Sequence, residues 1–159
     1  MIEAKIEGES LNISTRGRYG LRACVEIALN AERGPVRVSS IAREQKIPVS
    51  YLEQLLNKLR RGGVIRSVRG SKGGYLLNKP KDEITVREII EVLDGPFAVA
   101  GCSKDRLPGK TCIGPERCVA RLLWRRVEEN LDNLLDSITL EDLCRDCRRL
   151  SVGGRKENV

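Results

Sequence analysis

Residues 50–78, SYLEQLLNKLRRGGVIRSVRGSKGGYLLN, decide the fold of this chain. The first half has apolar residues at three- and four-residue spacing, which predicts an amphipathic helix. These residues are Leu52, Leu55, Leu56 and Leu59. Ser50 and Glu53 form an S-x-x-E pattern that predicts a capping box at the helix start, and Gly62-Gly63 predicts the helix end.

The second half of this stretch predicts a β-hairpin. Residues 64–69 and 75–78 are strand-like runs, and residues 70–74 between them contain three glycines. Glycine adopts positive φ and lets the backbone approach a partner closely, so residues 70–74 predict a tight hairpin tip. A phosphate-binding loop is excluded, because the pattern G-x-x-x-x-G-K-[ST] after a strand is absent.

Two helices are predicted upstream of Ser50. Residues 15–31 form an amphipathic pattern that ends at Gly34-Pro35, and residues 39–45 form a shorter one. A short helix and the helix after Ser50, joined by a tight turn, are the helix-turn-helix pattern. A basic hairpin directly behind it is typical of a wing. We therefore expect residues 12–96 to be a winged helix-turn-helix domain, mainly α with a small β-hairpin.

Downstream of the wing, Thr85 and Glu88 predict a second capping box, and its helix ends at Gly95-Pro96. Residues 97–118 are expected to be a cysteine-bearing loop. The longest helical pattern runs over residues 115–138, and its apolar stripe exceeds what a small head covers. This stripe predicts a dimerisation helix, although a helix folded back on its own head is the alternative.

The ends of the chain complete the predicted organisation. Thr139 and Asp142 predict the cap of a short terminal helix, so that residues 119–146 hold the dimerisation helix and this last helix. Residues 1–11 are expected to be a flexible arm and residues 147–159 a flexible tail.

The composition is that of an ordinary globular protein. The 159 residues are 40% hydrophobic and 32% charged, with 3% aromatic residues. No apolar run reaches the roughly 20 residues that span a bilayer, and the acidic start lacks the apolar centre of a signal peptide. We therefore expect a cytoplasmic protein without a membrane partner.

The positive charge is concentrated in the first half of the chain. Residues 14–79 contain fourteen Arg and Lys and four Glu, a net charge of +10. The whole chain has a net charge of +7, so the remainder carries −3. This imbalance favours a polyanionic partner for the first half, although a solvated basic surface would have the same composition.

A helix-turn-helix presents the start of its second helix to base edges in the major groove, and a wing places side chains at the minor groove. Gln54 is suited to adenine and Glu53 to cytosine, although Glu53 is equally explained by the capping box. Tyr51 could likewise be packed. The predicted DNA contacts are Arg16, Arg18, Ser50, Tyr51, Glu53, Gln54, Lys58, Arg69, Ser71 and Lys72.

Six cysteines in a cytoplasmic chain indicate metal binding rather than disulfides. Cys102, Cys112 and Cys118 share one loop, and their spacing suits an iron-sulfur cluster or zinc without deciding between them. Cys144 and Cys147 form a C-x2-C pair that could supply a half-site. The same pair allows a rival function as an electron carrier or thiol oxidoreductase, which lacks the usual βαβ context.

Three segments resemble one family of bacterial regulators, which includes the iron-sulfur regulator IscR, the nitric-oxide sensor NsrR and the cysteine-metabolism regulator CymR. These segments are STRGRYG at 14–20, SYLEQL at 50–55, and SVRG with GGYLL over 67–77. The resemblance covers about residues 12–143, and residues 112–125 are similar to the IscR cluster loop. It implies a homodimeric, non-enzymatic regulator that binds a palindromic operator on double-stranded DNA.

The same resemblance implies one iron-sulfur cluster per subunit, with 2Fe-2S favoured over 4Fe-4S. Cys102, Cys112 and Cys118 match the three cluster thiolates. IscR-like members have a histidine where this chain has Arg121, and the chain contains no histidine. Because arginine stays charged, it cannot be a ligand, and the fourth ligand is open among a carboxylate, another cysteine or a small molecule. A cluster-free regulator of sulfur metabolism, gated by a partner protein, is the alternative.

Overall fold

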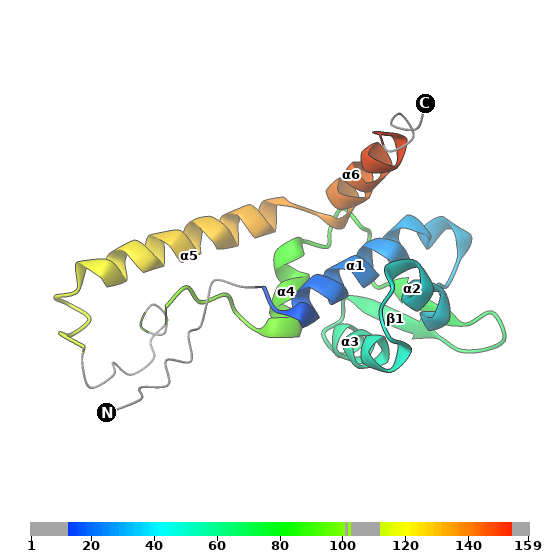
Figure 1. The fold of residues 1–159 in the computed structure, drawn as a ribbon, viewed down its shortest axis with the longest axis horizontal. Helices are drawn as coiled ribbons and strands as arrows, with labels where there is room; N and C mark the ends of the chain where they lie inside the picture. Colours follow the sequence, from blue (N-terminus) through cyan, green and yellow to red (C-terminus); the bar gives the residue numbers. More distant parts are fainter. Residues whose placement is uncertain (1–12, 101, 103–111, 154–159) are drawn as a thin grey trace.

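The computed structural model describes residues 13–100, 102 and 112–153, and shows a head of helices and one hairpin with two further helices attached (Figure 1). The elements are α1 (Thr15–Leu29), the 3-10 turn η1 (Ala31–Arg33), α2 (Val38–Gln45), α3 (Val49–Arg61), β1 (Ile65–Val68), β2 (Gly74–Leu77), α4 (Val86–Asp94), α5 (Val119–Ser137) and α6 (Leu140–Gly153). The predicted fold class, mainly α with a small β-hairpin, is confirmed. The predicted N-terminal arm and the end of the predicted tail lie outside the described residues.

Helix α1 is the centre of the head and packs against α2, α3, α4 and α6. Its buried side chains Ala23, Cys24 and Ile27 meet the leucine stripe of α3, which is fully buried as predicted. Gly20 lies where α1 crosses α4, and a Cβ there would collide with the Leu93 side chain. This glycine therefore sets how closely α1 and α4 approach.

The N-caps of α3 and α4 differ from each other in how far they agree with the predicted capping boxes. Helix α3 begins at Val49 with Pro48 as its N-cap, and no side chain caps it. The predicted box of Ser50 and Glu53 is wrong, because Ser50 is already inside the helix and cannot take the cap position. Thr85 does cap α4 by accepting from the Glu88 amide at 3.2 Å, while the Glu88 carboxylate pairs with Lys79 instead.

The cap of α6 is a complete box. The Thr139 hydroxyl accepts from the Asp142 amide at 3.3 Å, and the Asp142 carboxylate accepts from the Thr139 amide at 2.9 Å. The bond from the Thr139 amide, and a second one of 2.8 Å that the Thr139 hydroxyl donates to the same carboxylate, lower the pKa of Asp142. The helix that they start is longer than predicted, because it runs to Gly153 and takes in part of the predicted tail.

The hairpin is antiparallel and is attached to the segment before α2. Ile65 pairs with Leu77, and Val68 pairs with Gly74. Val36 adds a bridge to Tyr75 through two backbone hydrogen bonds, of 2.9 and 2.8 Å. The base of the wing is therefore part of the head.

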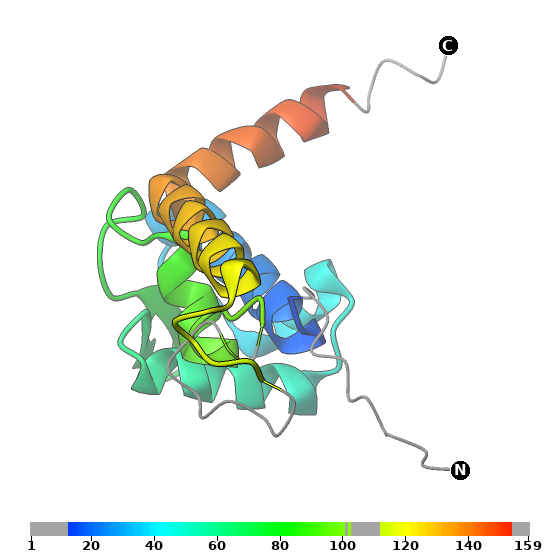
Figure 2. The ribbon, with the colours of Figure 1, turned by 90° about the vertical axis from the view of Figure 1, so that its left-hand side faces the viewer.

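Helix α5 projects from the head beside α4, with its C-terminal end at the head and its N-terminal end farthest from it (Figure 1), and Figure 2 looks along it. It begins four residues later than predicted, at Val119, because residues 115–117 form a turn. Four of its apolar side chains stay exposed: Val119 by 79%, Leu122 by 57%, Leu123 by 52% and Leu134 by 53%. The head of the same chain therefore leaves this part of the apolar stripe uncovered.

The junction of α4 and α5 is held by charge. The Arg87 guanidinium pairs with Glu91 on its own helix at 2.9 Å, and with Asp136 at 2.7 Å and Asp132 at 3.6 Å on α5. These partners raise the pKa of Arg87. The start of α4 is also bonded to the α5–α6 junction, from the Val86 amide to the Ile138 carbonyl at 2.9 Å. Two kinds of contact therefore fix the angle between α5 and the head.

None of the described helices is long and apolar enough to cross a membrane.

Candidate nucleic-acid interface and cysteine loop

The outward face of α3 is polar and exposed. Since the leucine stripe faces the core, the opposite side of the helix presents Ser50, Glu53, Gln54 and Lys58 to solvent. The Glu53 carboxylate has no hydrogen bond or ion pair with any described residue, as expected once the capping box is absent. This face is therefore free to meet a ligand.

Tyr51 is different from its neighbours on α3, because it is half-buried against the core. Its ring meets the Tyr19 ring edge-on, with centroids 6.1 Å apart and planes at 80°. Arg22 stacks over Tyr19 at 5.3 Å and donates to the Gln45 side chain at 3.1 Å. Tyr51 thus packs between α1 and α3, which is the alternative to a purely DNA-contacting role that the sequence left open.

The wing tip presents exposed Arg69, Ser71 and Lys72. Gly70 has a φ of 114°, so its backbone is in the region that glycine favours. The Ser71 carbonyl accepts a hydrogen bond of 2.6 Å from the Arg37 guanidinium. Arg37 is not among the predicted site residues, because it and Ser71 are 34 residues apart and no periodic signal in the sequence links them.

The start of α1 is held by the end of α4. Ser14 caps α1 by accepting from the Gly17 amide at 3.2 Å, and its own amide donates to Asp94 at the same distance. Arg16 pairs with Asp94 at 3.4 Å with its side chain about half exposed, and Arg18 is exposed beside Thr15. Both predicted arginines are accessible, and Arg16 is oriented by α4.

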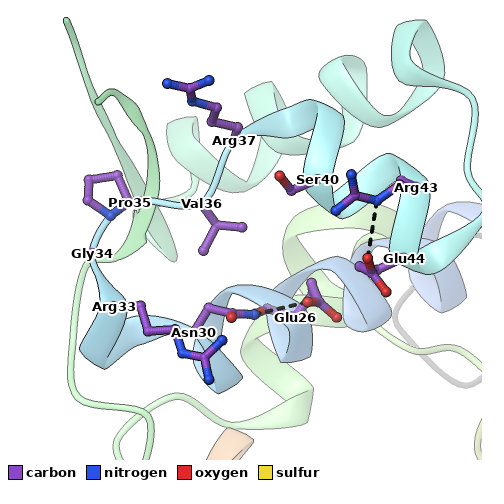
Figure 3. Close-up of a pocket in the computed structure, with 10 residues that line it drawn as sticks. All are labelled: Glu26, Asn30, Arg33, Gly34, Pro35, Val36, Arg37, Ser40, Arg43 and Glu44. Carbon is purple, nitrogen blue, oxygen red and sulfur yellow. Dashed lines mark hydrogen bonds and ion pairs between the residues drawn. The ribbon is translucent and has the colours of Figure 1, made fainter. Parts of the chain in front are cut away.

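A polar cavity of about 550 Å³ lies between the end of α1 and α2 (Figure 3). Glu26 forms part of its wall and accepts from the Asn30 and Gln45 side-chain amides, both at 2.9 Å. Arg43 pairs with Glu44 at 3.2 Å. The lining residues are Glu26, Asn30, Arg33, Gly34, Pro35, Val36, Arg37, Ser40, Arg43 and Glu44.

Burial sorts the cysteines into two groups. Cys24 is fully buried, and burial raises the pKa of its thiol to about 12. Cys144 is also buried in the core, and desolvation raises the pKa of its thiol. Buried, protonated thiols are poor ligands and nucleophiles. Cys24 and Cys144 are therefore removed as fourth-ligand candidates, and the C-x2-C pair is not a surface dithiol.

The three loop cysteines remain accessible. Cys102 and Cys118 are half-buried and Cys112 is exposed. Among the residues that the structure describes, no group of three or more cysteine or carboxylate side chains is close enough to hold a metal. The structure therefore does not assemble the predicted thiolate set, and part of the intervening loop lies outside the described residues.

Arg121, in the position of the family histidine, joins the loop to α5. Its guanidinium Nε donates to the Cys102 carbonyl at 3.0 Å, and its amide donates to the Cys118 carbonyl at 3.2 Å. Farther along α5, the buried Glu128 carboxylate accepts from the Val99 amide at 2.6 Å. The first part of the cysteine loop is thus fastened to α5 at two points.

Comparison with known proteins identifies the class. The IscR of Photorhabdus laumondii is 38% identical over 148 residues, which cover 93% of this chain and 88% of that protein. The solved structure of CymR, the global cysteine regulator of B. subtilis, has a TM-score of 0.70 at 40% identity and covers 85% of this chain and 97% of that one. The T. potens IscR structure also has a TM-score of 0.70, at 36% identity over 86% of this chain and 88% of that one.

The fold and these relatives define a DNA-binding transcription regulator with a winged helix-turn-helix. Residues 13–146 match the Rrf2 family, described as "Iron-dependent Transcriptional regulator". The chain belongs to the Rrf2 family, and the resemblance to IscR- and CymR-type regulators is confirmed. Its relatives are named as transcription regulators and not as enzymes.

Proposed function

We propose that this chain acts as a homodimer that binds a palindromic duplex site, with α3 in the major groove and the wing at the minor groove. The observation that carries this proposal is the exposed polar face of α3 beside an exposed basic wing, in the half of the chain with a net charge of +10. The proposed contacts are Arg16, Arg18, Ser50, Tyr51, Glu53, Gln54, Lys58, Arg69, Ser71 and Lys72, of which Tyr51 has the smallest free surface.

The side chains divide by task. Gln54 and Glu53, which are exposed on the first turns of α3, are suited to base edges. Lys58, about one turn farther along the helix, is suited to phosphate, which positions the protein without reading sequence. Arg69 at the tip is suited to a narrow minor groove, whose negative potential attracts guanidinium groups.

A binding site selected from a random-sequence duplex library tests this assignment. Gln54→Ala should lose affinity at one base-pair position, by about 1–3 kcal/mol. Lys58→Ala should weaken all duplexes alike and lower the salt slope by about one. Arg125→Ala on α5 is the control and should change neither. Wild-type protein that binds no selected duplex in a salt-dependent way would refute the proposal.

We further propose that Cys102, Cys112 and Cys118 hold an iron-sulfur cluster, with 2Fe-2S favoured. The residues fit such a group chemically: three thiols are outside the core, whereas Cys24 and Cys144 are sequestered within it. A bound cluster supplies a centre whose assembly depends on iron and whose loss follows oxidation. Arg121 and Glu128 connect the loop to α5 through hydrogen bonds. Ordering of the loop around a cluster would therefore also order the start of α5.

Anaerobic purification with iron and sulfide analysis tests the cluster. Cys112→Ser should lose the cluster absorption, whereas Cys24→Ser, at a thiol fully buried in the core, should keep it. A colourless wild type without iron that binds DNA normally would refute this part. That outcome would favour a cluster-free regulator gated by a partner protein, an alternative supported by the likeness to the cysteine regulator CymR.

A further inference from the structure

The wing tip is joined to the rest of the head by one side chain. The base of the wing is held by the β1–β2 ladder and by the Val36–Tyr75 bridge, but both stop before residues 69–73. Within these tip residues, the Gly73 amide donates to the Gly70 carbonyl at 3.0 Å. In the described part of the chain, the Arg37–Ser71 contact of 2.6 Å is the one hydrogen bond from the tip to another element.

Arg37 is suited to this task by its place in the chain. It is the N-cap residue of α2, and because a guanidinium only donates hydrogen bonds, it cannot cap the N–H groups of the helix and is available for an acceptor elsewhere. The preceding residue, Val36, is already bonded to β2. Figure 3 shows Arg37 at the far end of the cavity from Arg33. The fixed backbone at Val36 therefore aims the Arg37 side chain at the tip.

We propose that Arg37 is a positioning residue that sets where the wing tip meets DNA, acting through the Ser71 carbonyl rather than by touching phosphate itself. This inference rests on the proposed DNA-binding function. Without the contact, the tip would be hinged only at the hairpin base, and ordering it on DNA would cost conformational entropy at each binding event. Arg69 and Lys72 would then contact DNA less effectively although both are intact.

The test is a double-mutant cycle in the full-length protein on a duplex selected from a random library. Arg37→Ala should weaken binding about two- to tenfold, the range for one hydrogen bond. In an Arg69→Ala/Lys72→Ala background, where the two charged contacts of the tip are gone, Arg37→Ala should add little further loss. Its salt slope in the wild-type background should stay within half a unit of wild type.

Arg33→Ala is the matched control, because Arg33 lines the same cavity and is exposed without contacting the tip. Its effect should be the same in both backgrounds. A fully multiplicative effect of Arg37→Ala, or a salt slope lowered by about one, would overturn the proposal and indicate a direct phosphate contact.

Hydrogen exchange on the DNA-free protein separates this inference from the proposed function. Arg37→Ala should speed exchange of amides in residues 69–73 and leave those of β1 and β2 unchanged, whether or not the protein binds DNA. Unchanged exchange at the tip would refute the positioning role alone, and faster exchange in a protein that binds no duplex would refute DNA binding alone.

Discussion

Replacement of Leu123 and Leu134 by alanine should dissolve the proposed dimer without unfolding the chain. The two side chains are eleven positions apart on α5, which at about 100° per residue places them within about 20° of each other around the helix. They are 52% and 53% exposed in the single chain. They therefore share one face that the head leaves uncovered.

The size of the effect follows from this exposure. Full burial of a leucine contributes about 1.5–3 kcal/mol, so covering the exposed half of one side chain contributes about 1 kcal/mol. Two leucines in each of two subunits give about 4 kcal/mol, and 1.4 kcal/mol is tenfold in an equilibrium constant. The dimer dissociation constant should therefore rise about a thousandfold, while the free energy of unfolding of the isolated subunit changes little.

Sedimentation equilibrium over a range of concentrations measures that constant. Arg125→Ala is the control, since Arg125 is exposed on the opposite side of α5. The reasoning fails if the double variant dissociates at the same concentration as Arg125→Ala, or if the wild-type protein is itself a monomer throughout.

Three further predictions follow from single contacts. Gly20→Ala should lower the free energy of unfolding by about 1–3 kcal/mol in urea denaturation, because the new methyl group meets Leu93 where α1 crosses α4, and an unchanged midpoint would contradict that crossing. Cys24→Ser puts a hydroxyl in the core and should lower the free energy of unfolding by about 1–3 kcal/mol while leaving the cluster absorption intact. Cys112→Ser should remove the cluster absorption and leave the free energy of unfolding of the head nearly unchanged. The pKa of Asp142 is lowered in the folded state, so its contribution to stability is present at neutral pH and is lost as pH falls below the ordinary value of 3.8. In thermal unfolding, wild type should therefore melt at a higher temperature than Asp142→Asn at pH 7, and this difference should shrink at about pH 3. A difference that is the same at both pH values would contradict the reasoning.

Local patterns were sufficient to predict most of the elements. The leucine spacing of α3, the alternation and glycines of the hairpin, and the caps at Thr85 and Thr139 all depend on residues within a few positions of each other. Their signals are therefore visible in the sequence. Cys24 is fully buried because it lies on the apolar face of α1, which is itself a short-range pattern.

The errors also have physical reasons. Ser50 and Glu53 have the spacing of a capping box, but spacing does not fix which residue is the cap. The N-cap of α3 is Pro48, two residues before Ser50, and the helix begins at Val49. The predicted tail was interpreted as flexible because it is polar. Its first part is instead helical, as the continuation of α6, whose first turns pack against α1.

The sequence by itself determined the winged helix-turn-helix, the basic first half and the three cysteines of the loop, because these features depend only on composition and on the spacing of residues close together in the chain. Only the tertiary structure decided that Cys144 is sequestered, that Tyr51 packs on Tyr19, that Arg121 bonds to Cys102 and that Arg37 reaches Ser71. Each of these depends on how helices far apart in the chain pack against one another, and a single sequence carries no periodic signal for such contacts.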